Sequence, residues 1–419
     1  MILAKFGGSS LADGRRFQAV RRILLQDPSR RGVVVSAPGR RFPGDEKLTD
    51  LLYGCYDRSV TGGDWESLFA AVRARFEEIR ITCGIPVDLG GEFSRLSAGF
   101  AAGTVTRDEA ASRGEYFSAR LLAAYLGRQF LDSARWLRFT ADGQVDAVRS
   151  YGLLRQFAGV EFVTPGFYGA MPDGSIRTLT RGGSDVTGAL AAAALEAELY
   201  ENWTDVPGIF RADPALAPAA EPVDRMTYGE LADMSAVGTQ VLHEGAVRPV
   251  REAGIPLRVC SSFAPNLPGT WIEADPPAEP RKPVVAAAAR RERTILSLPG
   301  GELERLLTEA EISPDFLLTQ WGWQTASIPD DLFSARLDVF AGHLGEMQVQ
   351  SGVALAAAIF AEGQTVGEGA IARLLQKLAA EGIPVLAVLR PAERRILTLA
   401  VPEGRCAETV RILSGSEGE

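Results

Sequence analysis

The chain has 419 residues, 46% of them hydrophobic and 23% charged, which is typical of a soluble globular protein with two or three domains. Its formal net charge of −9 argues against a general nucleic-acid-binding surface, because such surfaces are rich in basic residues. Arginine supplies 40 of the 44 basic residues, so each of the four lysines invites a specific explanation.

Cysteine and histidine usage argues against a structural metal site. The cysteines are far apart and form no CxxC pair, and the chain has only two histidines, so we predict a reduced protein with no resident metal. Residues 1–8 do not resemble a signal peptide, and no apolar run approaches the roughly 20 residues that span a bilayer. We expect a cytoplasmic protein with no membrane or nucleic-acid partner.

The first two thirds of the chain alternate between short apolar runs and longer amphipathic or alanine-rich runs, which predicts an α/β sheet with helices on both faces. The predicted strands cover residues 2–6, 32–36, 161–164, 175–179, 199–203 and 255–259. The predicted helices cover residues 15–25, 50–56, 67–80, 115–126, 185–195 and 228–253.

A proline-rich, charged segment at residues 273–283 (EADPPAEPRKP) predicts the main domain boundary. Beyond it the pattern is close to two βαββαβ cycles, the ferredoxin-like plan. Two small α/β modules after a catalytic-sized domain suggest regulation by a small ligand, although packing or dimerisation alone would also explain them. The predicted elements there are 294–298, 302–311, 316–320, 324–328, 353–360, 369–381, 384–389, 396–401 and 406–413.

The first strand runs into the sequence KFGGSS, in which Gly7, Gly8 and Ser9 precede a predicted helix. Consecutive glycines let backbone N–H groups approach an anion, and Lys5 offers the compact charge that suits a phosphate. A purely structural turn would also explain the glycines.

Two further polar residues follow predicted strands or begin helices. Thr49 is either a helix N-cap or a hydroxyl aimed at a substrate carboxylate. Glu115 opens the predicted helix 115–126, where it either complements the helix dipole or binds a substrate amino group.

The segment TLTRGGSD at residues 178–185 combines side chains that a tight turn alone does not require. Arg181 suits a bidentate grip on a carboxylate, and Gly182 and Gly183 admit a phosphate close to backbone N–H groups. Ser184 and Asp185 then begin an alanine-rich helix. The next predicted strand is followed by Thr-Asp and a Pro-Gly turn, which fits a nucleotide rim that includes Thr204, Asp205, Phe210 and Asp213, although polar residues after a strand are common in any α/β protein. Each motif lies just beyond a predicted strand, where ligands bind in open α/β sheets.

These motifs together resemble the aspartate kinase family. The resemblance to the family rests on KFGGSS, the Gly-Glu pair at Glu115, TLTRGGSD and WTDVPGIF followed by ADP. Four further segments resemble the clostridial type of the family: VVVSAPG, KLTDLLY, GFYGAMPDG and VLHE. The resemblance implies the amino-acid-kinase fold, a three-layer sandwich with a mainly parallel central sheet, over residues 1–272. Ferredoxin-like ACT modules would follow at 284–350 and 351–413, where the likeness is looser.

The resemblance implies transfer of the γ-phosphoryl group from ATP, with Mg²⁺, to the side-chain carboxylate of L-aspartate. Lys5, Gly8 and Asp185 would be catalytic. Phosphate would contact Gly7, Gly8, Ser9, Gly182 and Gly183; aspartate would contact Ser9, Thr49, Glu115, Arg181 and Ser184; the nucleotide would contact Thr204, Asp205, Phe210, Asp213 and Gln240. An amino-acid effector at the ACT modules and a homodimer or larger assembly are also implied.

The chain departs from the family pattern at two basic positions. Ala215 replaces an arginine, and Gln240 replaces a lysine that faces phosphate. Two alternatives therefore stay open: a catalytically weakened regulatory homologue, or an acyl-phosphate kinase of the same fold that acts on another amino acid.

Overall fold

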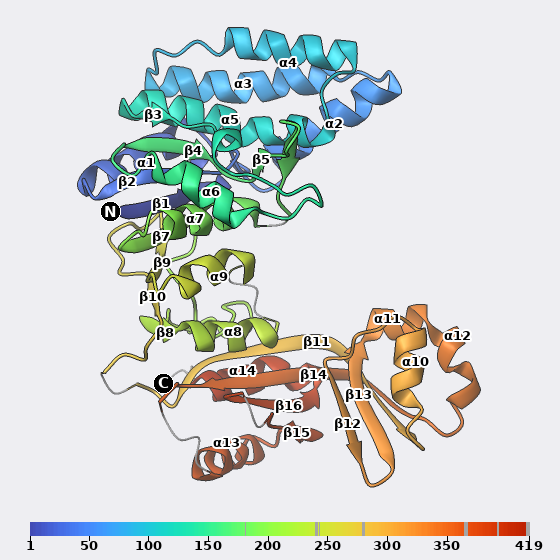
Figure 1. Cartoon of the computed structure of the whole chain (residues 1–419). Coiled ribbons are helices and arrows are strands. Elements are labelled where there is room, and N and C mark those ends of the chain that lie inside the picture. Colours follow the sequence, from blue (N-terminus) through green and yellow to red (C-terminus); the bar gives the residue numbers. More distant parts are fainter. Residues whose placement is uncertain are drawn as a thin grey trace. The chain divides into compact units, whose positions relative to one another are not determined.

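The computed structural model describes residues 1–180, 182–238, 242, 244–278, 281–363, 368–391 and 394–415 (Figure 1). Their contacts divide the chain into two compact units. Unit 1 comprises Met1–Ile209, Asp224–Tyr228 and Val241–Asp275, and unit 2 comprises Phe210–Val223, Gly229–Gln240 and Pro276–Glu419.

Within the described residues, unit 1 is built on an eight-stranded sheet of order β3-β4-β2-β1-β7-β9-β10-β8. Every neighbouring pair is parallel except β9 and β10. Central strands are buried on both faces, in agreement with their continuous hydrophobicity. The strands are β1 (Ile2–Phe6), β2 (Arg30–Val35), β3 (Gln129–Phe130), β4 (Phe162–Pro165), β7 (Leu199–Thr204), β8 (Arg225–Thr227), β9 (Leu257–Ser261) and β10 (Thr270–Glu273).

Helices cover both faces of this sheet. On one face α1 and α5 contact each other and α5 contacts the strands, while α2, α3 and α4 pack outside them (Figure 1). On the other face α7 crosses β1, β2 and β7, and α6 and α9 pack on α7. These layers confirm the predicted three-layer fold. The helices are α1 (Gly14–Gln26), α2 (Leu48–Thr61), α3 (Glu66–Cys83), α4 (Gly90–Ala102), α5 (Arg107–Leu126), α6 (Ala147–Arg155), α7 (Gly183–Ala194) and α9 (Glu244–Glu252).

Aromatic and aliphatic side chains fill the layer between the sheet and helices α1–α5. Phe6 and Trp203 stack across β1 and β7, with ring centroids 5.8 Å apart. Phe76, Phe93 and Phe117 join α3, α4 and α5 through ring contacts. This core fixes the positions of the ends of β1 and β2, which carry residues of the site described below.

Several elements predicted within residues 1–272 are corrected by the structure. The strand predicted at 175–179 is β6 (Ile176–Thr178), which pairs antiparallel with β5 (Tyr168–Ala170) outside the main sheet. The helix predicted at 228–253 is two helices, α8 (Tyr228–Ala236) and α9; Gly238, which follows α8, has a φ of 102°, a conformation that ends helices. Helix α5 begins at Arg107 rather than at Glu115, because Thr106 caps it by accepting a hydrogen bond from Glu109 N at 3.1 Å.

In its described part, unit 2 contains a six-stranded antiparallel sheet of order β12-β13-β11-β14-β16-β15. The strands are β11 (Val284–Pro299), β12 (Phe316–Gln320), β13 (Trp323–Pro329), β14 (Gln348–Phe360), β15 (Ala387–Leu389) and β16 (Ile396–Pro402). The helices that follow β11 are α10 (Leu303–Glu309), α11 (Asp330–Ala335), α12 (Leu337–Phe340), α13 (Glu368–Ala380) and α14 (Cys406–Ser414).

The strands β11 and β14 are longer than predicted and serve two cores. Register shifts between Arg290 and Ile295, with Glu292 at a φ of 57°, divide β11 into halves. The first half contributes Ala287 to an alanine-rich core with β16 and α14, and the second half contributes Leu296 to a leucine-rich core with α10. The module limits 284–350 and 351–413 stay a prediction, and the sheet is continuous across them.

Candidate active site

Lys5 near the end of β1 is the centre of a polar group in unit 1. Its side chain is buried, and Nζ lies 2.5 Å from Oδ1 of Asp185 in the first turn of α7. Nζ also donates a hydrogen bond of 3.3 Å to Oδ1 of Asn202, whose Nδ2 donates to Asp185 Oδ1 at 2.9 Å. The parallel register places Lys5 beside Asn202, so strand pairing and the start of α7 together fix the ammonium group.

Sequence reasoning missed Asn202. A signal was present, since an amide is unusual inside a buried strand, but its partner depends on the β1–β7 register, which the sequence alone does not give.

The glycines after Lys5 allow the loops that follow β1 and β2 to touch through their backbones. Gly7 N donates to the carbonyl of Trp203 at 3.0 Å, and Gly39 N donates to the carbonyl of Gly8 at 2.8 Å. A Cβ atom at Gly8 would lie 2.8 Å from the Ala37 carbonyl oxygen, closer than real Cβ contacts. Ser9 follows, half-buried, and its carbonyl accepts a 3.3 Å hydrogen bond from Arg16. The loop geometry therefore requires glycine at position 8.

A buried arginine from α3 holds the loop after β2, another feature that the sequence did not reveal. Arg75 Nη1 donates to the Gly39 carbonyl at 3.1 Å, and Nη2 donates to Asp45 Oδ2 at 2.8 Å. Asp45 also accepts from the backbone N and from Nε of Arg41, each at 3.0 Å. These hydrogen bonds keep the pKa of the Asp45 carboxyl well below its usual range. The loop between Gly39 and Asp45 is thus anchored on both sides.

Thr49 does not cap a helix, and Glu115 does not lie in the first turn of one. Thr49 is the second residue of α2 and half-buried, and the N-cap is Lys47. Glu115 is the ninth residue of α5, too far from its N-terminus to act on the helix dipole. A Cβ atom at Gly114 would lie 2.6 Å from Ala37 Cβ and 3.2 Å from Leu48 Cδ2. The position of Glu115 on α5 is therefore next to both the loop after β2 and the start of α2.

The Glu115 carboxyl is buried with an unused acceptor. Burial raises its pKa from 4.5 to about 8, opposed by a backbone hydrogen bond from Ala37. Among the described residues, no hydrogen-bond partner meets its Oε2. A buried carboxyl with an open oxygen is suited to receive a cationic group of a ligand.

The turn before α7 packs tightly against the turn after β4. Gly182, at a φ of 74°, is the N-cap of α7, and a Cβ at Gly183 would lie 2.7 Å from Phe167. Ser184 is half-buried and touches Gly166, where a Cβ would lie 2.7 Å from its Oγ. Arg181 lies outside the described residues.

The end of β7 meets the start of the chain's first helical turn. The Thr204 carbonyl accepts from Ser262 N at 2.8 Å, and Ser262 Oγ lies 2.6 Å from Ser10 Oγ. Thr204 Oγ1 donates to exposed Asp205 at 3.1 Å. Thr204 and Asp205 therefore border the same edge of the sheet as the Gly7–Gly8 turn.

The remaining predicted nucleotide contacts are not in unit 1. Phe210 and Asp213 belong to unit 2, where Phe210 packs against the alanine-rich core and Asp213 Oδ1 accepts from Ala215 N at 2.9 Å. Gln240 lies outside the described residues. Nucleotide contact by these residues stays a prediction.

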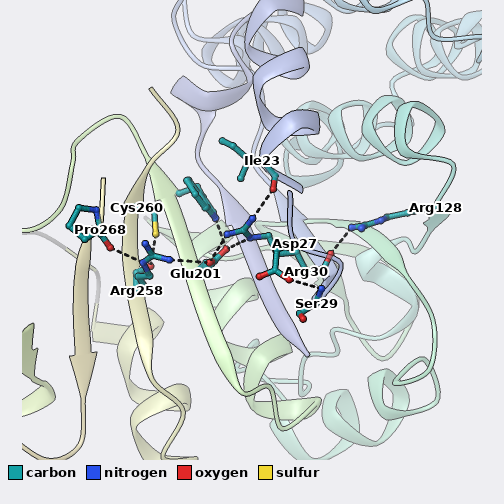
Figure 2. Close-up of polar contacts among 10 residues, drawn as sticks. Ile23, Asp27, Ser29, Arg30, Arg128, Glu201, Arg258, Cys260 and Pro268 are labelled. Atoms are coloured by element: carbon teal, nitrogen blue, oxygen red, sulfur yellow. Dashed lines mark hydrogen bonds and ion pairs between the residues drawn. The ribbon is translucent and has the colours of Figure 1, made fainter. Parts of the chain in front are cut away.

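Buried charges on the opposite face of β7 support the strands that carry the site (Figure 2). Glu201 is 1% exposed and accepts from Arg30 Nε at 2.7 Å and from Trp203 Nε1 at 2.9 Å. Arg258 on β9 lies 3.7 Å from the same carboxylate. Because side chains alternate along a strand, Glu201 points away from the face used by Asn202. This group joins β2, β7 and β9.

No cluster of three or more His, Cys, Asp or Glu side chains that could hold a metal ion occurs among the described residues. None of the helices in the described part of the chain is long and apolar enough to cross a membrane.

Known proteins resemble this chain over most of its length. The profile of the amino acid kinase family matches residues 1–261. The lysine-sensitive aspartokinase 3 of Escherichia coli is 30% identical in a match that covers 95% of this chain and 92% of that protein. Aspartokinase 3 of Bacillus subtilis is 32% identical over 65% of this chain, and that match spans 63% of the relative's length.

Solved structures give the same result. The aspartate kinase of Clostridium acetobutylicum has a TM-score of 0.91 and 28% identity, covering 100% of this chain and 99% of that one. Aspartokinase III of E. coli in complex with aspartate and ADP has a TM-score of 0.74 and 26% identity, with full coverage of both chains.

Proposed function

Because this chain belongs to the amino acid kinase family and, within it, to the aspartokinases, we propose that it phosphorylates the side-chain carboxylate of L-aspartate with ATP. The product would be 4-phospho-L-aspartate. The observation that carries the proposal is the ion pair of buried Lys5 with Asp185, beside the Gly7–Gly8 turn. The E. coli structure with aspartate and ADP supports it.

The chemistry needs no histidine base. A carboxylate is already ionised near pH 7 and can act as the nucleophile directly. One of its oxygens forms a bond to the γ-phosphorus, while the bond from that phosphorus to the bridging oxygen breaks and its electron pair leaves with ADP. Positioning and charge neutralisation supply the catalysis, and Lys5, held by Asp185 and Asn202, is the cation placed for this task.

The substrate amino acid would be recognised at both of its charged backbone groups. In this proposal the open Oε2 of Glu115 receives the α-ammonium group, and Arg181 grips the α-carboxylate. Thr49, Ser9 and Ser184 complete the aspartate site with hydroxyl groups. Burial of Glu115 strengthens its selection of a cation, because few waters compete.

The donor set fits a magnesium ion that arrives with the nucleotide. Mg²⁺ in phosphoryl-transfer sites is commonly held by one or two carboxylates together with substrate phosphates, so it needs no protein cage. We assign this role to Asp185, whose side chain is 23% exposed. When bound, the ion neutralises phosphate charge. Gly7, Gly8, Gly182 and Gly183 would contact the phosphates, and Thr204, Asp205, Phe210, Asp213 and Gln240 the rest of the nucleotide.

Unit 2 would regulate the enzyme. The E. coli relative is named as lysine-sensitive, and the antiparallel sheet with helices in unit 2 suits paired ACT modules at 284–350 and 351–413. We propose that they bind an amino-acid effector and that the chain acts as a homodimer or larger assembly in the cytoplasm, with residues 1–272 as the catalytic part.

Trapping the acyl phosphate with hydroxylamine tests the proposal. The full chain is incubated with MgATP and, separately, L-aspartate, L-glutamate and other acidic amino acids, and the hydroxamate is measured. A hydroxamate with aspartate alone supports the aspartate kinase. A hydroxamate with another amino acid, and none with aspartate, supports an acyl-phosphate kinase that acts on that amino acid. The absence of a hydroxamate with every substrate supports a regulatory homologue without kinase activity.

A further inference from the structure

An arginine interrupts the buried face of α3. The other buried residues of this helix are Phe69, Val72, Phe76 and Ile79, at the spacing of an apolar stripe that packs on a core. Arg75 lies within the stripe, and only 5% of its side chain is exposed. Because a charge is costly to bury, a residue of this kind in this place indicates a role beyond filling the core.

The guanidinium group of Arg75 joins two backbone segments that border the candidate phosphate turn. Its Nη1 donates to the Ala12 carbonyl at 3.5 Å, just after the short helix that begins at Gly8. The same atom donates to the Gly39 carbonyl at 3.1 Å, and Nη2 donates to Asp45 at 2.8 Å. One side chain therefore holds the segment after Gly8 and the loop after β2, which already touch through the hydrogen bond from Gly39 N to the Gly8 carbonyl.

Asp45 neutralises the buried charge. It accepts hydrogen bonds from the side chain and the backbone of Arg41 as well as from Arg75. The hydrogen bonds from Arg41 and the nearby charge of Arg75 hold the pKa of the Asp45 carboxyl well below its usual range, so it is ionised near pH 7. Apolar side chains of similar volume commonly stabilise a fold as well as a buried ion pair does, so stability alone does not explain this pair.

We propose that Arg75 is a positioning residue for phosphoryl transfer, which fixes the Gly7–Gly8 turn through the two carbonyls that it holds. The proposal rests on the proposed kinase function, in which the turn contacts the transferring phosphate. The turn also lies close to Lys5, since a Cβ atom at Gly7 would be 3.5 Å from Nζ. A shift of the turn therefore changes the spacing between its backbone N–H groups and the ammonium group.

Arg75→Lys tests this role in the full chain. Lysine keeps a positive charge opposite Asp45 but lacks the planar fork that holds two carbonyls and a carboxylate together. We expect kcat for hydroxamate formation from L-aspartate and MgATP to fall about 10²-fold, with a smaller change in the KM for aspartate. Arg73→Lys is the matched control on the same helix, because Arg73 is exposed and lies over the Phe93 ring. Normal kcat in Arg75→Lys would overturn the proposal.

A double variant separates positioning from stability. Asp45→Asn leaves Arg75 buried without its full counter-charge and should lower the free energy of unfolding, which denaturant unfolding measures. Adding Arg75→Met removes that charge, so D45N/R75M should recover part of the lost stability. Its kcat should nevertheless be lower than that of Asp45→Asn, because the two carbonyls then have no donor at position 75. A kcat that rises together with stability would show that Arg75 only stabilises the fold, and it would overturn the proposal.

Hydrogen exchange measured by mass spectrometry gives a readout that needs no activity. In Arg75→Lys, peptides that cover residues 7–12 and 37–46 should exchange faster than in the parent chain, whereas peptides from β9 should not change. Unchanged exchange in the first two peptides would overturn the role of Arg75. Failure of the parent chain to form a hydroxamate would instead overturn the proposed function, so the two failures are distinguishable.

Discussion

The backbone nitrogen of Gly39 donates a 2.8 Å hydrogen bond to the carbonyl oxygen of Gly8, and this contact joins the loops that follow the first two strands of the sheet. The loops can come this close because neither residue has a side chain. Arg75 then holds the Gly39 carbonyl from the other side. The position of the Gly7–Gly8 turn is therefore determined by a residue of α3 as well as by β1.

Gly8→Ala should lower kcat much more than it lowers thermal stability. The new Cβ would meet the Ala37 carbonyl oxygen at 2.8 Å, so the turn must move away from the loop after β2. A displacement of this kind near a transferring phosphoryl group costs about 10²-fold in rate. Gly91→Ala in the first turn of α4 is the control, because its Cβ meets nothing within 4 Å. Normal kcat in Gly8→Ala would remove the turn from the phosphate site.

Lys5→Arg should lower kcat by about 10²–10³-fold and change the KM for aspartate little, which steady-state kinetics measures. The ammonium group is a compact charge 2.5 Å from Asp185, and a longer planar guanidinium cannot occupy the same point. Lys377→Arg makes the same substitution in unit 2 and should leave the rate unchanged. Near-normal turnover of Lys5→Arg contradicts its catalytic role.

Aspartate binding should release a proton from Glu115 near pH 7. Burial raises the pKa of this carboxyl to about 8, and a bound ammonium group would favour the ionised form. Calorimetry in buffers of different ionisation enthalpy measures the release. Glu115→Gln should abolish it and raise the KM for aspartate about 10–100-fold, the value of a hydrogen bond to a charged group. Proton release that persists in Glu115→Gln would assign it to another group.

The same carboxyl should make stability depend on pH. The folded chain keeps the Glu115 proton up to about pH 8, whereas the unfolded chain loses it near 4.5. The folded state binds more protons between these values, so the contribution of this group to stability decreases as pH rises through that window. Subtracting the Tm–pH curve of Glu115→Gln from that of the parent chain isolates the effect. A contribution of Glu115 to Tm that increases as pH rises from 4.5 to 8 would contradict this prediction.

Glu201→Gln should destabilise unit 1 by about 3–5 kcal/mol, because it leaves Arg30 buried without its counter-charge. The double variant E201L/R30M should lose less than the single variant, since it removes both buried charges. Arg305→Ala breaks exposed ion pairs and should leave the free energy of unfolding unchanged. Denaturant unfolding measures all three, and additive losses in the double variant would contradict a coupled pair.

Sequence pattern was sufficient for the alternation of strands and helices in unit 1 and for the glycine and polar residues that follow several of its strands. Lys5 and the Gly7–Gly8 turn stood out because a strand followed by consecutive glycines leaves a local signal, whereas the catalytic roles of Lys5, Gly8 and Asp185 were implied by the family resemblance. The structure brings the Lys5 ammonium group to the Asp185 carboxylate, and the roles themselves stay a prediction. In unit 2, the strand predicted at 316–320 is β12 with the same bounds.

What the sequence could not supply depends on contacts between distant residues. Asn202 and Arg75 join the site through register and helix packing, which leave no local pattern. Helix α5 was predicted to begin too late, because Thr106, its cap, precedes charged residues and not an apolar run. The helices α4 and α6 were not predicted at all.

Unit 2 has a further consequence for how this chain can be divided. Each half of β11 packs in a different core of unit 2. A cut between β13 and β14 therefore separates the first half of β11 from its core, and it separates the start of β14 from the second half of β11, with which it pairs. Fragments 281–347 and 348–415 should each stay unfolded when expressed alone and acquire structure when mixed, as two complementary parts. A gene duplication or exchange that transfers one module would therefore have to include both β11 and β14. The smallest part of unit 2 that can be transferred without loss of structure is the whole unit.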